Sequence, residues 1–234
     1  MLTSFNLPVR ALILVLIGLC GVSFRAPAAH IVFLARKPSH RPGEHEHLAG
    51  CLLFQSCLDG LPGVTSVVYS NGWPAVEAGA FDGATAVVVY SDGGGRHPLL
   101  QGDRLETIRA LMDWGVGLGL IHYACEPTRE HGQKEFIEWV GGAFEIHWSV
   151  NPVWTANFTS IPQHPVTRGV RPFSLYDEWY FHLRFRDGME GVTPILAAVA
   201  PESTMRRADG PHSGNPAVRE SVARCEPQTV LWVA

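Results

Sequence analysis

The 234-residue sequence lacks the charge pattern of a nucleic-acid-binding or membrane-surface protein. Charged residues make up only 17% of it, with 18 Lys and Arg against 22 Asp and Glu and no long run of either sign. A formal net charge of -4 without a basic patch argues against nucleic acid and anionic membranes as partners. The 46% of hydrophobic residues is enough for one globular domain with a substantial core. Charge and composition therefore do not argue against small neutral ligands as partners.

Long apolar runs are also scarce, and the clearest one lies near the N-terminus. Arg10 precedes an unbroken apolar stretch, Ala11 to Val22, and the small residues Ala26-Pro27-Ala28 follow shortly after it. About a dozen apolar residues fit a secretory signal and fall short of the roughly 20 needed to span a bilayer. We predict that residues 1–29 are a signal peptide, cleaved near Ala28 or Ala29, and that the mature protein is secreted or periplasmic without stable membrane insertion. An uncleaved membrane anchor is the alternative.

Cysteine is the third scarce feature, with four residues after the signal: Cys51, Cys57, Cys125 and Cys225. Export would allow disulfides, but the spacing shows no obvious pair. Cys51 and Cys57 lie six residues apart on one expected helix, which turns them to different faces. We expect small buried hydrophobic residues, except at Cys125, where a thiol at a helix N-terminus would be reactive.

Short β-rich runs alternate with helical segments, which predicts a layered α/β fold with a mostly parallel sheet. The expected parallel strands, compact apolar runs without clean alternation, are 30–35, 66–69, 85–90 and 116–121. The expected helices are 44–58, with Glu44 and Glu46 in its first turn, then 103–114, 134–140 and, after Asn215 and Pro216, 217–223. Antiparallel strands are expected at 153–158 and 179–185, and the chain ends in an apolar run, 229–234. No internal repeat is present, so we expect one domain.

Ligands in parallel sheets gather at the carboxyl ends of the strands, which directs attention to three loops. The loop 36–47 carries three histidines, but His45 and His47 should point in different directions, so we expect one functional histidine here. The glycine-rich loop with Asp92 and Gly93 could offer backbone N–H groups to a ligand, or be a plain connection. It matches no phosphate-binding fingerprint, so no nucleotide cofactor is expected.

The turn at His122, directly after an apolar strand, is the sharpest feature of the sequence. Several α/β enzymes expose a catalytic residue on such a strand-to-helix turn, flanked by small residues. Here one flank, Leu120, is large while Ala124 is small, and the apex is an imidazole. A proton carrier or a metal ligand fits the apex better than a covalent nucleophile. Cys125 is a less favoured nucleophile and could also join His122 in a metal site.

A last cluster, Tyr176-Asp177-Glu178-Trp179-Tyr180, places adjacent carboxylates among aromatic rings. Aromatic faces pack on sugar rings, and carboxylates accept hydrogen bonds or protons from hydroxyl groups. The alternative is a strand with one solvated acid and one aromatic core face.

Several segments together resemble the ThuA-like, or trehalose-utilisation, family. They are KPSHRPGEHEH near the start, GLIHYACEP after its strand, HPVTRGV, and the pattern of Phe173, Asp177, Glu178 and Tyr180. The resemblance covers nearly all of residues 30–234 and implies a flavodoxin-like, class I glutamine amidotransferase-like three-layer sandwich with a role in carbohydrate metabolism. Residues on family motif positions are His45, His122, His164, Asp177, Glu178 and Tyr180.

The resemblance also places His122 where the related glutaminases carry their catalytic cysteine, so glutaminase activity is not expected. Family members usually continue through another strand and a Gly-His motif, so we expect the domain at 30–234 to be C-terminally truncated, without its final strand and helix.

These observations lead to three functional hypotheses. The first is an exported protein of disaccharide or keto-sugar metabolism. Its expected catalytic residues are His122 and Glu178, and its expected saccharide-binding residues are His45, Asp92, Gly93, Tyr123, His164, Asp177 and Tyr180. The second is a carbohydrate-binding module without catalysis. The third is a metal-dependent hydrolase, with a divalent metal held by residues from the set His45, His122, Cys125 and Glu178.

Overall fold

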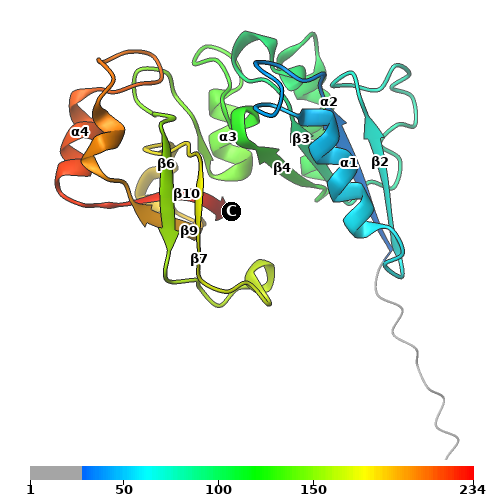
Figure 1. Ribbon diagram of the computed structural model, residues 1–234. Coiled ribbons are helices and arrows are strands. Elements are labelled where there is room, and N and C mark those ends of the chain that lie inside the picture. The colour runs from blue at the N-terminus through cyan, green and yellow to red at the C-terminus, as the bar shows by residue number, and fades with distance from the viewer. Residues whose placement is uncertain (1–27) are drawn as a thin grey trace, which may run out of the picture.

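A four-stranded parallel sheet forms the N-terminal part of the computed structural model, which describes residues 28–234 (Figure 1). Its strands are β1 (Ala29–Ala35), β2 (Val64–Tyr69), β3 (Ala86–Tyr90) and β4 (Gly117–Ile121), and all four predicted parallel strands are confirmed. The order β2-β1-β3-β4 is that of the first four strands of flavodoxin-like folds. The predicted signal peptide, apart from Ala28 and Ala29, falls outside the described residues. Within the described chain, no helix combines the length and apolarity required to cross a membrane.

Helices cover both faces of this sheet, which makes three layers (Figure 1). They are α1 (His47–Leu58), α2 (Arg104–Asp113) and α3 (Gln133–Val140). Alternation along β1 explains the layers, because Val32 and Leu34 pack on the core with α2 and α3, whereas Phe33 and Ala35 pack with α1. The predicted three-layer α/β sandwich is therefore confirmed.

The start of α1 corrects the predicted boundary at Glu44. The helix begins at His47, and both acidic side chains bond to the loop before it. Glu44 Oε2 accepts from the Arg41 N–H at 2.9 Å, and Glu46 Oε1 accepts from the Gly43 N–H at 2.8 Å. These carboxylates therefore shape the loop after β1 instead of lying in the first turn of the helix.

The C-terminal part (residues 142–233) has its own hydrophobic core. Its strands are β5 (Gly142–Ala143), β6 (Val153–Phe158), β7 (Phe173–Glu178), β8 (Arg184–Phe185), β9 (Thr193–Val199) and β10 (Pro227–Val233). Strand β6 pairs with β7 and β9 pairs with β10, both antiparallel. Trp154, Ala156 and Phe158 alternate inward along β6 and pack with α4 (Pro216–Ala223). As predicted, Asn215 caps α4, its Oδ1 accepting from the Val218 N–H at 3.0 Å.

The predicted continuous strand at 179–185 is wrong, because only β8 at its end is a strand and Phe181 forms an isolated antiparallel bridge with Val150. His182 has φ 55°, a left-handed conformation that interrupts a strand between the buried Phe181 and Leu183. Buried and less buried side chains therefore alternate in this segment although its backbone does not form a continuous strand. The C-terminal apolar run, by contrast, has a partner in β9.

Short 3-10 helices connect several elements. They are η1 (Gly94–Arg96), η2 (Pro98–Leu100), η3 (His122–Cys125), η4 (Pro165–Thr167), η5 (Asp187–Met189) and η6 (Glu202–Met205). Of these, η3 directly follows β4 and carries the predicted turn at His122.

Candidate active site

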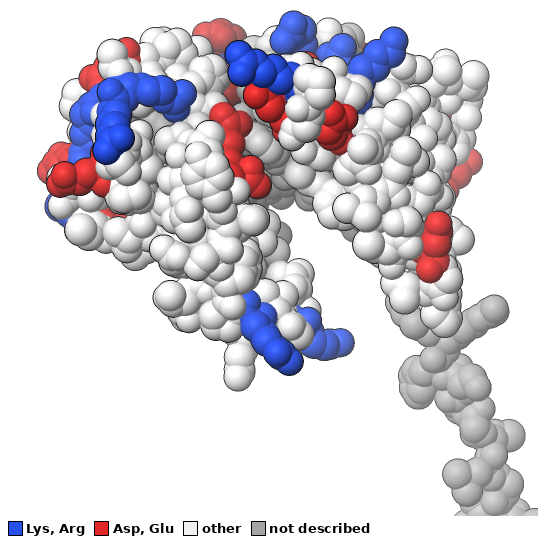
Figure 2. Space-filling model, in the orientation of Figure 1, with Lys and Arg blue, Asp and Glu red and all other residues white. Residues whose placement is uncertain are grey.

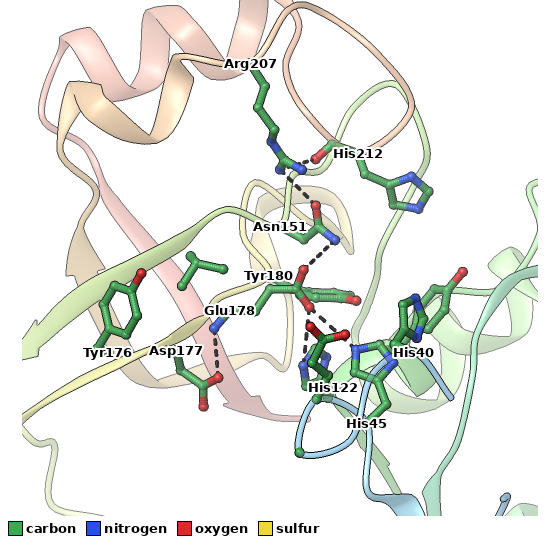
Figure 3. A pocket seen from close by; sticks show the side chains of 14 residues that line it. His40, His45, His122, Asn151, Tyr176, Asp177, Glu178, Tyr180, Arg207 and His212 are labelled. Carbon is green, nitrogen blue, oxygen red and sulfur yellow. Dashed lines mark hydrogen bonds and ion pairs between the residues drawn. The ribbon is translucent and has the colours of Figure 1, made fainter. Parts of the chain in front are cut away.

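A cavity of about 560 Å³ lies between the carboxyl ends of the parallel strands and the C-terminal part (Figure 3). The N-terminal part contributes Gly43, Glu44, His40, His45, His122 and Tyr123, and the C-terminal part contributes Asn151, Val153, Tyr176, Asp177, Glu178, Tyr180, Arg207 and His212. In the space-filling view, acidic side chains gather where the surface is hollowed between the two parts (Figure 2). The cavity therefore lies where ligands bind in open parallel sheets.

His122 stands at the apex of a strained turn. Its φ of 56° lies in the left-handed region, which non-glycine residues adopt at a cost of about 1–3 kcal/mol and mostly at functional sites. The turn itself was predicted, but the α-helix expected after it is replaced by the single 3-10 turn η3. Pro127 explains this difference, because the residue before a proline is disfavoured in helical conformation.

Three polar side chains from distant segments converge at this turn. His122 Nε2 lies 3.5 Å from Glu178 Oε2, and His45 Nε2 lies 3.7 Å from the same oxygen (Figure 3). His45 comes from the loop after β1, His122 follows β4, and Glu178 ends β7. The convergence of His45, His122 and Glu178 is the geometry that the sequence-based hypotheses require.

Aromatic rings hold the imidazole of His122 in place. The Tyr180 ring meets it edge to face at 4.7 Å between centroids, and the His45 ring does so at 4.9 Å. Its Nδ1 is buried without a hydrogen-bond partner among the described residues. Such an unsatisfied buried group costs about 1–3 kcal/mol. The imidazole is therefore fixed mainly by packing, with Nε2 turned to the cavity.

Burial shifts the protonation of all three groups toward their neutral forms. Desolvation, followed by the repulsion of His45, lowers the pKa of His122 to about 4. Desolvation, followed by the charge of His40, lowers the pKa of His45 as well, and desolvation raises the pKa of Glu178. Because His122 is then neutral at neutral pH, its 3.5 Å approach to Glu178 is not an ion pair. The Nε2 atoms of two imidazoles and a carboxylate oxygen face a shared space.

Ser39 connects His45 to a buried carboxylate behind the cavity. Its hydroxyl donates to Asp92 Oδ1 at 2.5 Å and contacts His45 Nδ1 at 3.2 Å. Because the hydroxyl has one proton and an ionised carboxylate only accepts, Ser39 must accept from the His45 Nδ1–H. This fixes the tautomer with an unprotonated Nε2 toward Glu178.

Glu178 is held from its other side by the C-terminal part. Asn151 Nδ2 donates to Glu178 Oε1 at 3.0 Å, and Arg207 Nη2 donates to Asn151 Oδ1 at 3.0 Å (Figure 3). One carboxylate oxygen is thereby oriented, and Oε2 stays free to face the two histidines.

The structure brings most of the predicted site residues together. His45, His122, Tyr123, Asp177, Glu178 and Tyr180 all line the cavity. His47 does not line the cavity, because it is fully buried and its Nδ1 contacts the Lys37 carbonyl at 3.1 Å, although its ring lies 5.7 Å from that of His45. The loop 36–47 nevertheless brings a second histidine, His40, to the cavity.

Two predicted binding residues, Asp92 and Gly93, are buried behind the cavity wall and do not line it. Asp92 orients Ser39, and Gly93 packs against the backbone carbonyl of Tyr123. The Gly94 N–H bonds to the Glu126 carbonyl at 2.8 Å, so this loop braces the turn of His122 and that N–H is not free for a ligand.

His164 and Cys125 are not brought to the cavity lining. The side chain of His164 caps η4 by accepting from the Val166 N–H at 3.3 Å. Cys125 is buried, and burial raises the pKa of its thiol, which opposes the reactive thiolate considered from the sequence. The four cysteines are free, and Cys57 and Cys225 are exposed, contrary to the expectation of burial.

Sequence reasoning missed Asn151, Arg207 and His212. His212 Nε2 bonds to the buried Glu126 Oε2 at 2.9 Å, which ties the loop before α4 to the turn of His122. For Arg207 and His212, the only sequence signal was the density of basic and polar residues in the loop 203–214, a pattern that is equally typical of a solvated connection.

Comparison with known proteins supports the fold. No protein-family profile matches the sequence, and no curated protein matches it. The structure is similar to the crystal structure of a protein from Bacteroides uniformis described as ThuA-like, with a TM-score of 0.58 and 14% sequence identity. The match covers 89% of this chain and 78% of that chain. This chain therefore has the fold of a protein assigned to the family that its motifs resemble.

Proposed function

We propose that this protein is a ThuA-like enzyme of carbohydrate metabolism, and that its substrate, a disaccharide or a keto-sugar, reacts at His122 and Glu178. The observation that carries the proposal is the convergence of His45, His122 and Glu178 in the cavity at the carboxyl ends of the strands. Perturbed titratable groups gathered in a cleft are typical of active sites.

The remaining cavity lining suits a polyhydroxylated ligand. Asn151 and Arg207 supply amide and guanidinium groups, and the exposed carboxylate of Asp177 accepts hydrogen bonds from hydroxyl groups. Tyr176, 69% exposed, and the exposed Val153 offer an apolar surface on which a sugar ring packs. A thiol mechanism has no support in this cavity, because the imidazole of His122 lines it and Cys125 does not.

The test is product formation from a panel of di- and keto-saccharides. The wild type should turn over at least one of them, and His122→Ala should reduce kcat/KM by 10²-fold or more, on the order of a general acid–base contribution. His131→Ala, which removes an exposed histidine outside the cavity, is the matched control. Unchanged turnover in His122→Ala would exclude the proposed centre.

A carbohydrate-binding module without catalysis is the second candidate, favoured by the exposed Tyr176 and Val153 beside the cavity. Calorimetry separates the two, because a binding module would show saccharide binding without product in long incubations. Absence of binding across the whole panel would contradict both candidates.

A further inference from the structure

We propose that His45 Nε2, His122 Nε2 and Glu178 Oε2 are the three protein ligands of a divalent zinc site. This inference shares only its cavity with the proposed function. The test of the zinc site requires no substrate. Each residue offers one donor atom, and these three atoms lie within 4.8 Å of one another.

The separations between the donor atoms suit an ion better than direct hydrogen bonds. Both nitrogen-to-oxygen distances, 3.5 and 3.7 Å, exceed the usual N–H···O range of about 2.7–3.2 Å. Ligands about 2.0–2.1 Å from a tetrahedral Zn²⁺ are about 3.4 Å apart, close to both distances. Small side-chain movements therefore complete the coordination.

The groups behind His45 and Glu178 hold these two ligands in the form that a cation requires. The Ser39 hydroxyl accepts from the His45 Nδ1–H and donates to Asp92 Oδ1. With its proton on Nδ1, His45 has the Nε2 lone pair available for a metal. Metal-binding histidines commonly have such a partner on the second ring nitrogen. Asn151 engages only Oε1 of Glu178, so Oε2 is free to coordinate.

The donor set disfavours Mg²⁺ and Ca²⁺ and leaves one coordination position open. Two imidazoles and one carboxylate suit zinc, whereas Mg²⁺ and Ca²⁺ prefer all-oxygen sites. Three protein ligands leave the fourth position of a tetrahedron for water or a substrate oxygen, as catalytic zinc sites require. The side chains are only 9% (His45), 19% (His122) and 26% (Glu178) exposed, so the ion would be shielded yet reachable from the cavity.

A second set, His40, His45 and Asp92, also gathers donor atoms within 4.8 Å. In this set the hydroxyl of Ser39 already bonds Asp92 and contacts His40 Nδ1 at 2.9 Å. Ser39 therefore already engages one donor atom of each of these two residues, and it also separates them from a shared ion position on that side. The set with Glu178 has both Nε2 atoms and Oε2 turned to the cavity, so it is favoured.

The test is calorimetric titration of the chelator-treated full chain, purified without a metal-affinity tag, with ZnCl₂. We expect one equivalent to bind to the wild type and to His131→Ala, and no measurable binding to His122→Ala or Glu178→Gln. Ser39→Ala, which retains all three ligands, should weaken Zn²⁺ binding by roughly 10–100-fold. Circular dichroism of each variant checks that lost binding does not come from lost folding.

Three results would overturn the zinc site: less than a tenth of an equivalent bound by the wild type, undiminished binding in His122→Ala, or binding lost in His40→Ala but kept in His122→Ala. The two proposals fail separately. Saccharide turnover by a wild type that binds less than a tenth of an equivalent of zinc in the titration contradicts the zinc site alone. Zinc binding with no saccharide turnover or binding contradicts the proposed function alone.

Discussion

His97 should make the protein lose stability in acid, and the size of this effect follows from its burial. The fully buried side chain accepts from the Leu99 N–H at 3.1 Å, and its Nε2 donates to the Ala124 carbonyl, 3.0 Å away, in the turn that carries His122. Desolvation lowers its pKa from 6.5 to about 3. The native state therefore holds a neutral imidazole that supports the turn of His122.

Proton linkage gives the sign and the magnitude. Below pH 6.5 the unfolded His97 binds a proton that the folded one does not, so acid favours unfolding. Its contribution to stability is fully present above about pH 6.5 and is lost progressively as pH falls toward about 3. Between about pH 7.5 and 5 the loss is about 2 kcal/mol, from about 1.4 kcal/mol per pH unit.

The assay is urea unfolding between pH 5 and 8, followed by tryptophan fluorescence. His97→Gln removes the titrating group, so we expect a lower free energy of unfolding at pH 7.5 but a fall on acidification that is smaller by about 2 kcal/mol than in the wild type. The remaining fall comes from His45, His47, His122 and His182, whose pKa values are also lowered by burial. His131→Gln controls for removal of a histidine. Equal pH dependence in His97→Gln and the wild type would refute the reasoning.

Three further predictions concern the turn and the cavity. Gly93→Ala should lower the free energy of unfolding by roughly 1–3 kcal/mol in chemical denaturation, because the added Cβ would meet the Tyr123 carbonyl oxygen and lie 2.7 Å from the Glu126 carbonyl oxygen. Gly95→Ala, where the added Cβ would enter open space, is the control, and equal effects of the two substitutions would argue against this packing. Tyr176→Ala should raise the calorimetric Kd for a bound saccharide roughly two- to tenfold at unchanged melting temperature, whereas removal of the still more exposed ring in Trp114→Ala should not. Identical affinities of Tyr176→Ala and the wild type would exclude a stacking role. Cys125→Ala should keep saccharide turnover within about twofold, since this buried thiol resists ionisation, and a loss of turnover in a folded variant would point to thiol chemistry.

The parallel sheet and the His122 turn were predictable because their signals are local. Apolar runs fix β1, β3 and β4, and the ends of parallel strands share one edge, so His45 and His122 had to lie near each other. The other side of the cavity was harder to predict. Asn151 and Arg207 reach Glu178 because the C-terminal part folds back, and periodicity does not specify that packing.

Two errors have local causes that residue identity alone does not reveal. His164 stands in a motif-like segment, yet its side chain caps the following turn instead of reaching the cavity. The pattern around Phe181 and Leu183 alternates like a strand, but the left-handed conformation of His182 interrupts the extended backbone. In both cases a backbone conformation decided the role of the side chain.

The most direct test of the active-site assignment is a crystal structure of the protein with a bound di- or keto-saccharide. The account predicts the sugar in the cavity between β4 and β7, with an oxygen within roughly 3.2 Å of Glu178 Oε2 or His122 Nε2, or joined to both through an ion. A saccharide bound elsewhere, such as the second cavity beside Pro194 and Pro227, with the His45, His122 and Glu178 cluster untouched, would contradict it.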